Sequence, residues 1–251
     1  MRKPPLVVVG TPGSGTRVFA RLAEAAGWDM GAHQTEANDA FAFFWFANRW
    51  CERVYPAWAS GGPIDHAEFE AELRPCLEAH LSDTEAGAPW GWKQPRSLYM
   101  LPALRHVFPE IGVIHVIRDG RDVAFSAEPN VKLAGRFALP ESAAERPKEV
   151  KVAHIWDAPN RLAADFGEGE LGLEERYLRL RLEDVCAEPA QTAERLVAFA
   201  GGKPIEPGRV EAIVRPPSSL GRWRAKDPAL VAEIEAVAAE GLRRFGYASS
   251  T

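Results

Sequence analysis

The first run of hydrophobic residues, 6–9, is short, continuous and rich in β-branched side chains. Proline precedes it and glycine follows it, which is typical of a strand buried inside a parallel sheet. From residue 17 to 26, apolar residues recur at helical spacing, and Gly27 supplies a stop. The start of the chain therefore predicts a strand, a glycine-rich loop over residues 10–16, and a helix.

Two later segments have the pattern of strands. Residues 113–117 form a second buried run, followed by a turn and a short helix over 121–127. Residues 177–182 alternate with a period of two, which indicates a sheet edge or a half-covered face. Helices are expected over 189–200, 207–214 and 228–245. This order predicts an α/β fold around a central parallel sheet.

The segments between these units do not belong to a sheet-building repeat. An aromatic helical stretch covers 41–58 and an acidic amphipathic one covers 65–81. We expect residues 35–85 to form a helical cap beside the mouth of an active site. Residues 129–151 are rich in proline, alanine and charge, which predicts a lid-like loop.

Composition bounds the class of protein. A chain of 251 residues, 46% hydrophobic and 26% charged, is ordinary for a globular protein, and we expect a single domain over residues 1–251. The net charge of −5 argues against broad nucleic-acid binding. Three cysteines without C-x-x-C spacing favour neither disulfides nor a zinc site, and no apolar run is long enough for a membrane span. We therefore expect a cytoplasmic protein.

The loop over residues 10–16 has the features of an anion site. A glycine-rich turn between a parallel strand and a helix directs backbone N–H groups and the positive end of the helix dipole toward one point. The hydroxyls of Ser14 and Thr16 add donors, and Gly13 and Gly15 permit close approach of an oxyanion. The alternative is a tight turn that binds nothing.

The usual nucleotide motifs fit this loop poorly. Gly10 and Gly15 have P-loop spacing, but Thr16 and Arg17 stand where lysine and a magnesium-binding hydroxyl are required. Val18 stands where a dinucleotide-binding fingerprint wants glycine. The sequence therefore gives only weak support to ATP or NAD as the ligand.

A second motif covers residues 118–126. It places Arg118 at the carboxyl end of a buried strand and Ser126 one to two helical turns later. A guanidinium fork and a hydroxyl can converge on one phosphate. Taken alone, the stretch Arg-Asp-Gly-Arg-Asp is a solvated turn with locally paired charges as often as it is a phosphate site.

Taken together, these motifs resemble the sulfotransferase superfamily, and its bacterial members in particular. Residues 10–17 look like its 5′-phosphosulfate loop, and 118–126 look like its 3′-phosphate motif. Three further segments are similar to family elements: 91–96 to the K-x-P element, 180–185 to the R-Y-E-D-L segment, and 219–224 to the late G-x-W element.

The resemblance implies a P-loop-like three-layer fold that transfers a sulfuryl group from 3′-phosphoadenosine-5′-phosphosulfate (PAPS). The acceptor would be a hydroxyl or amine of a small molecule or carbohydrate, the product nucleotide would be PAP, and no metal would be needed. The implied cofactor-binding residues are Thr11, Pro12, Gly13, Ser14, Gly15, Thr16, Arg17, Arg118, Ser126 and Arg222.

Departures from the family pattern concern catalysis and, at Leu182, a contact with the adenosine of the cofactor. Gly13 stands where most members carry lysine or arginine, so we expect Lys93, assisted by Arg17, to supply the cation. Leu182 replaces the usual tyrosine of the R-Y-E-D-L segment, and Pro95 stands where some members carry a catalytic histidine.

The general base is expected among His33, Glu36 and Asp39, with Glu36 preferred. The alternative is that these residues cap a helix starting near Asn38. Two other functions stay open at this point: a nucleotide kinase or NTPase of related fold, and a non-catalytic PAP-binding protein, which the glycine at position 13 favours.

Overall fold

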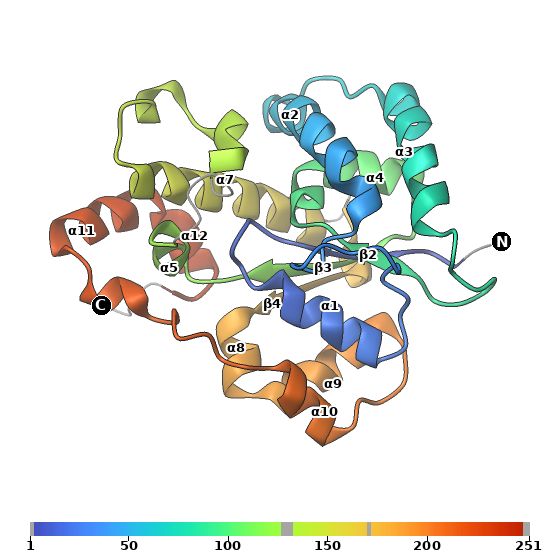
Figure 1. Cartoon of the computed structure of the whole chain (residues 1–251). Helices are drawn as coiled ribbons and strands as arrows, with labels where there is room; N and C mark the ends of the chain where they lie inside the picture. The colour runs from blue at the N-terminus through green and yellow to red at the C-terminus, as the bar shows by residue number, and fades with distance from the viewer. Residues whose placement is uncertain (1–2, 127–132, 170–171, 248–251) are drawn as a thin grey trace.

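The computed structural model describes residues 3–126, 133–169 and 172–247 (Figure 1). Within this part of the chain, four parallel strands form one sheet in the order β2-β1-β3-β4. The strands are β1 (Leu6–Val9), β2 (Gly91–Lys93), β3 (Gly112–Ile117) and β4 (Tyr177–Arg181). Because all four are parallel, their carboxyl ends meet at one edge, where α/β proteins bind ligands.

The pattern-based strands at 6–9, 113–117 and 177–182 are confirmed. Strand β2 has no pattern of its own, since three residues are too few to show a period. Its position depends on Gly91, which pairs with Leu6. A Cβ atom at Gly91 would lie 2.0 Å from the carbonyl oxygen of Leu6, so a glycine is needed for β2 to approach β1.

Short helices cover one face of the sheet. They are α1 (Thr16–Ala25), α8 (Leu182–Ala187), α9 (Pro189–Ala200) and α10 (Pro207–Ile213). They pack on the apolar side chains that alternate strand positions direct to this face: Leu6, Val8, Ile114, Val116 and Leu180. Figure 1 shows these helices below the sheet.

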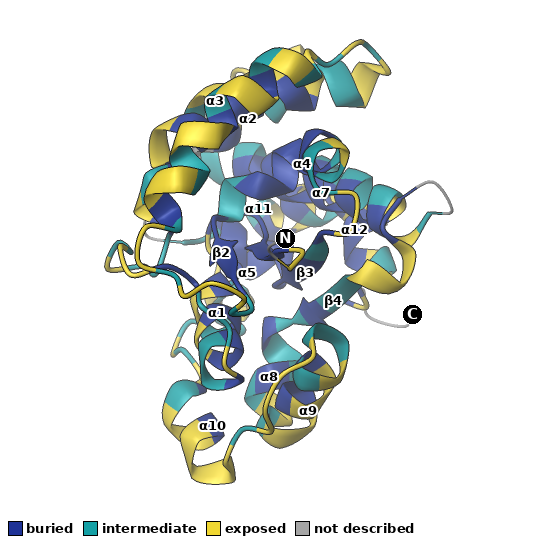
Figure 2. Ribbon diagram, turned by 90° about the vertical axis from the view of Figure 1, so that its right-hand side faces the viewer, coloured by how far each residue is buried: buried dark blue, intermediate teal, exposed yellow. Residues whose placement is uncertain are grey.

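The opposite face carries longer helices. The longer ones are α2 (Phe44–Ser60), α3 (His66–His80) and α7 (Lys148–Glu168). The short helix α4 (Leu101–Val107) and the 3-10 turns η1 (Phe41–Phe43) and η2 (Pro95–Met100) lie with them. The core here joins Val7 and Val113 of the sheet to Trp50 of α2, Phe69 of α3 and Trp92 of β2. The expected helical cap therefore packs into the main core on one side and exposes its outer side (Figure 2).

The remaining elements extend the fold beside β3. Helices α5 (Gly120–Ala124), α11 (Pro228–Val237) and α12 (Ala239–Arg244) share a third core with α7. Shorter 3-10 turns are η3 (Leu133–Ala138), η4 (Glu141–Ala143), η5 (Glu174–Arg176) and η6 (Arg222–Ala225). The single helix expected over 228–245 is divided at Ala238, which is the C-cap of α11 and the N-cap of α12.

Helices on both faces of a parallel sheet confirm the predicted three-layer fold. The expected lid over 129–151 lies partly outside the described residues, and its described part forms η3, η4 and the start of α7. No helix in the described ranges is long and apolar enough to cross a membrane.

Candidate active site

The first loop joins β1 to α1 at the carboxyl edge of the sheet. Gly13 and Gly15 have φ of 93° and 87°, in the left-handed region that favours glycine. Inside the loop the Thr11 and Ser14 hydroxyls lie 3.0 Å apart, and both residues are buried. These two hydroxyls therefore hold the loop's shape, whereas Thr16 lines the cavity outside it. At the start of α1 the Val18 N–H donates to the carbonyl oxygen of Gly15, the N-cap, at 3.1 Å, and the N–H groups of Thr16 and Arg17 come before any partner within the helix.

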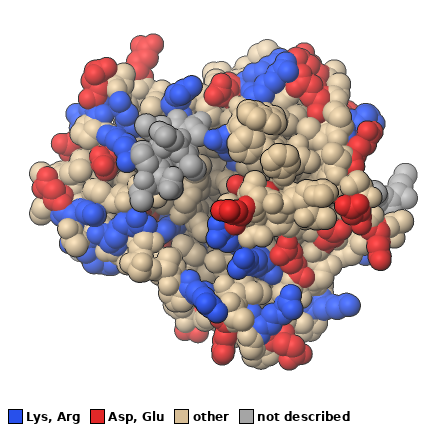
Figure 3. Space-filling model, in the orientation of Figure 1, with Lys and Arg blue, Asp and Glu red and all other residues tan. Residues whose placement is uncertain are grey.

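A cavity of about 650 Å³ opens in front of the loop. Its walls come from the first loop and α1, the start of α2 and the segment before it, the end of β2 and the segment after it, the residues that follow β3 and β4, and the segment after α10. Five of the lining residues are cationic and one is a carboxylate: Arg17, Lys93, Arg96, Arg118 and Arg215, with Asp39. Figure 3 shows a hollow in the middle of this face with lysine or arginine side chains along its border. Such a cavity fits a polyanionic ligand.

Arg118 connects the two predicted phosphate motifs. It follows β3 directly, is 6% exposed, and lines the cavity. Its Nη1 donates to the carbonyl oxygen of Gly13 at 3.5 Å, and its Nη2 donates to the carbonyl and hydroxyl oxygens of Ser219 at 2.7 and 3.0 Å. Its buried Nε has no hydrogen-bond partner in the part of the chain that the structure describes. The guanidinium is thus fixed in place and retains unused donor capacity.

The turn that follows Arg118 is buried and is not a solvated turn. Asp119 and Arg121 form an ion pair with a distance of 2.8 Å between Oδ2 and Nη2, and Arg121 also donates to Glu235 at 2.7 Å. Arg121 stacks on the Trp223 ring at 3.7 Å. The residues of this motif therefore build a rigid support for Arg118.

Asp122 holds the late segment 219–224 against this support. Its carboxylate accepts hydrogen bonds from the backbone N–H groups of Gly221 at 2.6 Å and Trp223 at 3.2 Å. Between these two residues, Arg222 donates to the carbonyl oxygen of Phe125 at 3.2 Å. Burial, and then the charge of Arg118, lower the pKa of Arg222. Two guanidiniums are therefore held close together, and an anion between them would relieve their repulsion.

Ser126 lies at the edge of this group. It is half-buried, its backbone N–H donates to the carbonyl oxygen of Val123, and it does not line the cavity. Arg222 donates to the carbonyl oxygen of Phe125, the residue before Ser126. The structure thus brings Arg118 and Arg222 together and leaves Ser126 next to them.

Lys93 is the buried cation of the cavity. It ends β2, is 3% exposed, and forms an ion pair with Asp39. Its Nζ also donates to the carbonyl oxygen of Ala37 at 2.7 Å. Burial lowers the pKa of Lys93, the Asp39 carboxylate raises it, and the charge of Arg17 lowers it further. The Asp39 carboxylate therefore favours the charged form of Lys93 against the effects of burial and of Arg17.

The other predicted catalytic residues differ in position. Arg17 is exposed on the first turn of α1 and lines the cavity. Glu36 is exposed and is not among the lining residues, whereas Asp39 is. A bond from the Ala40 N–H to the Lys93 carbonyl oxygen, 2.8 Å long, ties Asp39's segment to β2. The structure therefore brings Asp39 to the cavity and leaves Glu36 outside it.

Sequence reasoning did not assign several residues of this site. Asp122 and Ser219 lie inside quoted motifs, but nothing in their spacing shows that they position the arginines. Arg96 follows the K-x-P element directly and also lines the cavity. No group of three or more metal-ligating side chains occurs in residues 3–126, 133–169 and 172–247.

Comparisons with known proteins agree with this geometry. Residues 4–206 match the model of the sulfotransferase family. The match covers most of the chain, and the chain belongs to this family. No match was found among curated proteins.

Solved sulfotransferases share the fold at low sequence identity. One from Mycobacterium tuberculosis aligns with a TM-score of 0.59 and 17% identity over 96% of this chain and 77% of its own. One from Alicyclobacillus acidocaldarius aligns with a TM-score of 0.57 and 16% identity over 96% and 94%. One from Mycobacterium avium aligns with a TM-score of 0.55 and 16% identity over 97% and 77%. At this identity the likeness shows the fold alone.

Proposed function

We propose that this protein transfers the sulfuryl group of PAPS to a hydroxyl or amine of a small-molecule or carbohydrate acceptor. The observation that carries the proposal is the meeting of the two phosphate motifs: Arg118 bonds to Gly13 of the first loop and lies beside Arg222. A nucleotide with phosphates at both its 5′ and 3′ ends would place one anion against each motif.

The residues at hand fit such a donor. The N–H groups of the first loop and Thr16 would hold the 5′-phosphosulfate. Arg118 and Arg222, with Ser126 beside them, would hold the 3′-phosphate. The close approach of Arg118 and Arg222 favours a doubly charged ligand group between them over a neutral ribose hydroxyl.

The transfer step needs one cation and one base. The acceptor oxygen or nitrogen attacks sulfur, the bond between sulfur and the bridging phosphate oxygen breaks, and PAP leaves. Negative charge grows on that leaving oxygen, and Lys93, assisted by Arg17, stabilises it. The acceptor's proton passes to a carboxylate, and Asp39 takes this role in place of Glu36 because Asp39 lines the cavity.

Aromatic side chains at the start of α2 would receive the acceptor. Phe44 lines the cavity and packs edge-on against Trp45, with 5.2 Å between ring centroids. Trp45 and Phe41, near Phe44 in the chain, are 75% and 60% exposed. Exposed rings at a cavity mouth suit sugar rings and flat apolar molecules alike.

A direct activity assay tests the proposal. The protein is incubated with PAPS, with EDTA, and with panels of phenols, aliphatic alcohols, amines and monosaccharides, and both PAP and the sulfated acceptor are quantified by mass spectrometry. We expect PAP and sulfated product in equal amounts. If the protein binds PAP but forms no sulfated product with any acceptor, the non-catalytic alternative is supported. A strict requirement for magnesium would support a kinase or NTPase.

A further inference from the structure

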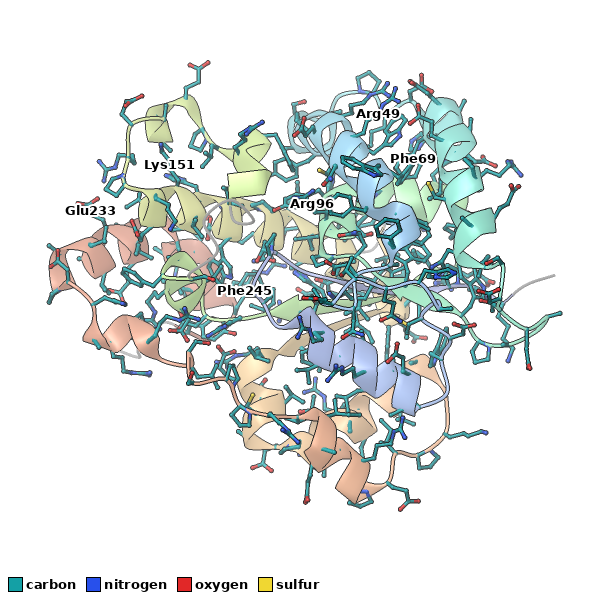
Figure 4. All side chains as sticks on the ribbon, in the orientation of Figure 1. Arg49, Phe69, Arg96, Lys151, Glu233 and Phe245 are labelled. Atoms are coloured by element: carbon teal, nitrogen blue, oxygen red, sulfur yellow. The ribbon has the colours of Figure 1, made fainter. Side chains whose placement is uncertain are left out.

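Arg96 lines the cavity but has no task in the mechanism above. It is the second residue of η2, directly after Pro95, and it is half-buried. Figure 4 labels Arg96 near the centre of the molecule, between α2 and α7. The sequence motif that contains Lys93 thus delivers a second cation to the same cavity.

The position of Arg96 is on the α2 side of the cavity. Burial raises the pKa of the Cys51 thiol, in α2, to about 12, and the positive charge of Arg96 opposes that rise. The same charge opposes the rise in the pKa of buried Tyr99. The 3-10 turn η2, which carries Arg96, packs against α2. Phe44 of α2 lines the cavity as well.

The guanidinium of Arg96 makes no hydrogen bond or ion pair with any residue in the described ranges. The other half-buried or buried cations of the cavity differ, since Arg118 bonds to Ser219 and Lys93 bonds to Asp39. Arg17 and Arg215 also lack such bonds, but they are exposed and hydrated. Arg96 thus lines the cavity with no partner for its charge in the described ranges, and a bound anion would supply one.

The cavity itself does not provide that anion. Among the lining residues that the structure describes, the carboxylate is Asp39, which Lys93 already engages. The anions of the donor also have other partners, the first loop for the 5′ end and the Arg118–Arg222 pair for the 3′ end. An anion for Arg96 must therefore come with the acceptor.

We propose that the acceptor carries an anionic group, such as a carboxylate, and that Arg96 binds this group while the reacting hydroxyl or amine faces Lys93 and Asp39. The inference rests on the proposed function and narrows its acceptor class to acidic molecules. A guanidinium can hold a carboxylate through two parallel hydrogen bonds, which fixes orientation as well as charge.

Matched acceptors test the inference in a binding experiment. In each pair, one acceptor carries a carboxylate and the other carries the neutral amide in its place. The pairs are 4-hydroxyphenylacetate with 4-hydroxyphenylacetamide, glucuronate with glucuronamide, and 3-hydroxydecanoate with 3-hydroxydecanamide. Calorimetry on the PAP-loaded protein gives the affinity of each. We expect at least one pair in which the acid binds roughly 10–100-fold more tightly, as for a hydrogen bond to a charged group.

Variants at Arg96 test whether this side chain causes the preference for the acid. Arg96→Ala should bring the acid and the amide to equal affinity, Arg96→Lys should keep part of the preference, and both should bind PAP as the wild type does. Arg215→Ala is the matched control, because it removes an exposed arginine from the same cavity. That variant should keep the preference for the acid.

Other outcomes overturn the inference. No preference for the acid in any pair, or a preference that survives in Arg96→Ala, would contradict it. A loss of PAP affinity in Arg96→Ala as large as that in Arg118→Ala would assign Arg96 to the donor. Failure of the wild type to bind PAP would count against the proposed function, and the pairs would then be compared on the free protein.

Discussion

Lys93 and Asp39 form an ion pair inside the cavity, with Lys93 almost fully buried at the end of β2 and Asp39 on the segment that leads into α2. The pair joins the sheet that carries the proposed donor site to the segment that leads into α2. Because residue 13 is glycine, the first loop has no lysine or arginine at that position. Lys93 lines the same cavity as Gly13.

The first prediction concerns the cation. Lys93→Ala should lower kcat by roughly 10²–10³, the loss seen when one donor that stabilises transition-state charge is removed, while the Kd for PAP changes much less. Single-turnover kinetics with PAPS and calorimetry with PAP measure the two quantities. Arg17→Ala is the comparison: a normal rate in Lys93→Ala together with a large loss in Arg17→Ala would transfer the role to Arg17.

Asp39→Asn should affect both the base and the charge of Lys93. We expect kcat to fall by roughly 10²–10⁴, as for loss of a general base. The rate also falls as pH rises through the pKa of Lys93, because deprotonation removes the cation. Asp39 raises that pKa, so in the variant the falling limb of the profile of kcat against pH should move to lower pH.

Glu36→Gln is the control for this prediction, because Glu36 was the residue preferred from sequence. A larger loss in Glu36→Gln than in Asp39→Asn would make Glu36 the base. An unchanged falling limb in Asp39→Asn would show that the carboxylate does not hold the charge of Lys93.

The geometry of the first loop predicts a difference between two glycines. A Cβ atom at Gly15 would lie 2.7 Å from Leu182, and its φ of 87° is unfavourable for alanine. Gly27 has a similar φ of 96°, but a Cβ atom there would meet nothing within 4 Å. Both alanine variants share the backbone cost of about 1–2 kcal/mol.

We therefore expect Gly15→Ala to be the less stable of the two by about 1–3 kcal/mol, since it adds overpacking against Leu182, and to bind PAP more weakly. Urea unfolding and PAP calorimetry on both variants provide the measurements. Equal stability would mean that Leu182 yields to the added methyl group.

His115 predicts a dependence of stability on pH. It is buried between Asn160, at 2.9 Å from Nε2, and the Tyr177 hydroxyl, and burial lowers its pKa to about 3. Below pH ~6.5 the unfolded chain binds a proton at this residue and the folded chain does not. As the pH is lowered from ~6.5 to 3, the free energy of unfolding should therefore decrease, by up to about 1.4 kcal/mol per pH unit from this group.

Urea unfolding from pH 7.5 to pH 5 measures this slope. His115→Gln lacks the titrating group, so its slope should be shallower than that of the wild type even if the variant is less stable at every pH. Parallel slopes would contradict a neutral buried histidine.

Local patterns in the sequence predicted the elements that depend on local signals. The buried runs at β1 and β3 and the proline-initiated helices α9 and α10 follow from residues within each segment. Helix α7 was not predicted, because its apolar residues contact two cores and Pro159 interrupts its pattern.

The residues of the site also divide into those with a local signal in the sequence and those without one. The first loop and Arg118 could be recognised from glycine and arginine spacing. Asp39 and Arg96 depend on contacts between distant segments: Asp39 meets Lys93 across 54 positions, and Arg96 reaches the environment of Cys51 in α2. Spacing along the chain holds no information on such contacts, which is why Glu36 was preferred over Asp39.

The central claim is that the paired phosphate motifs bind a nucleotide with phosphates at both ends, and calorimetry with PAP on the wild type and Arg118→Ala tests it most directly. We predict a Kd for PAP in the micromolar range or tighter for the wild type, about −8 kcal/mol, and a loss of about 1.5–3 kcal/mol in the variant. AMP, which lacks the 3′-phosphate, should bind both proteins with the same affinity. Equal PAP affinity in the two proteins would contradict the account.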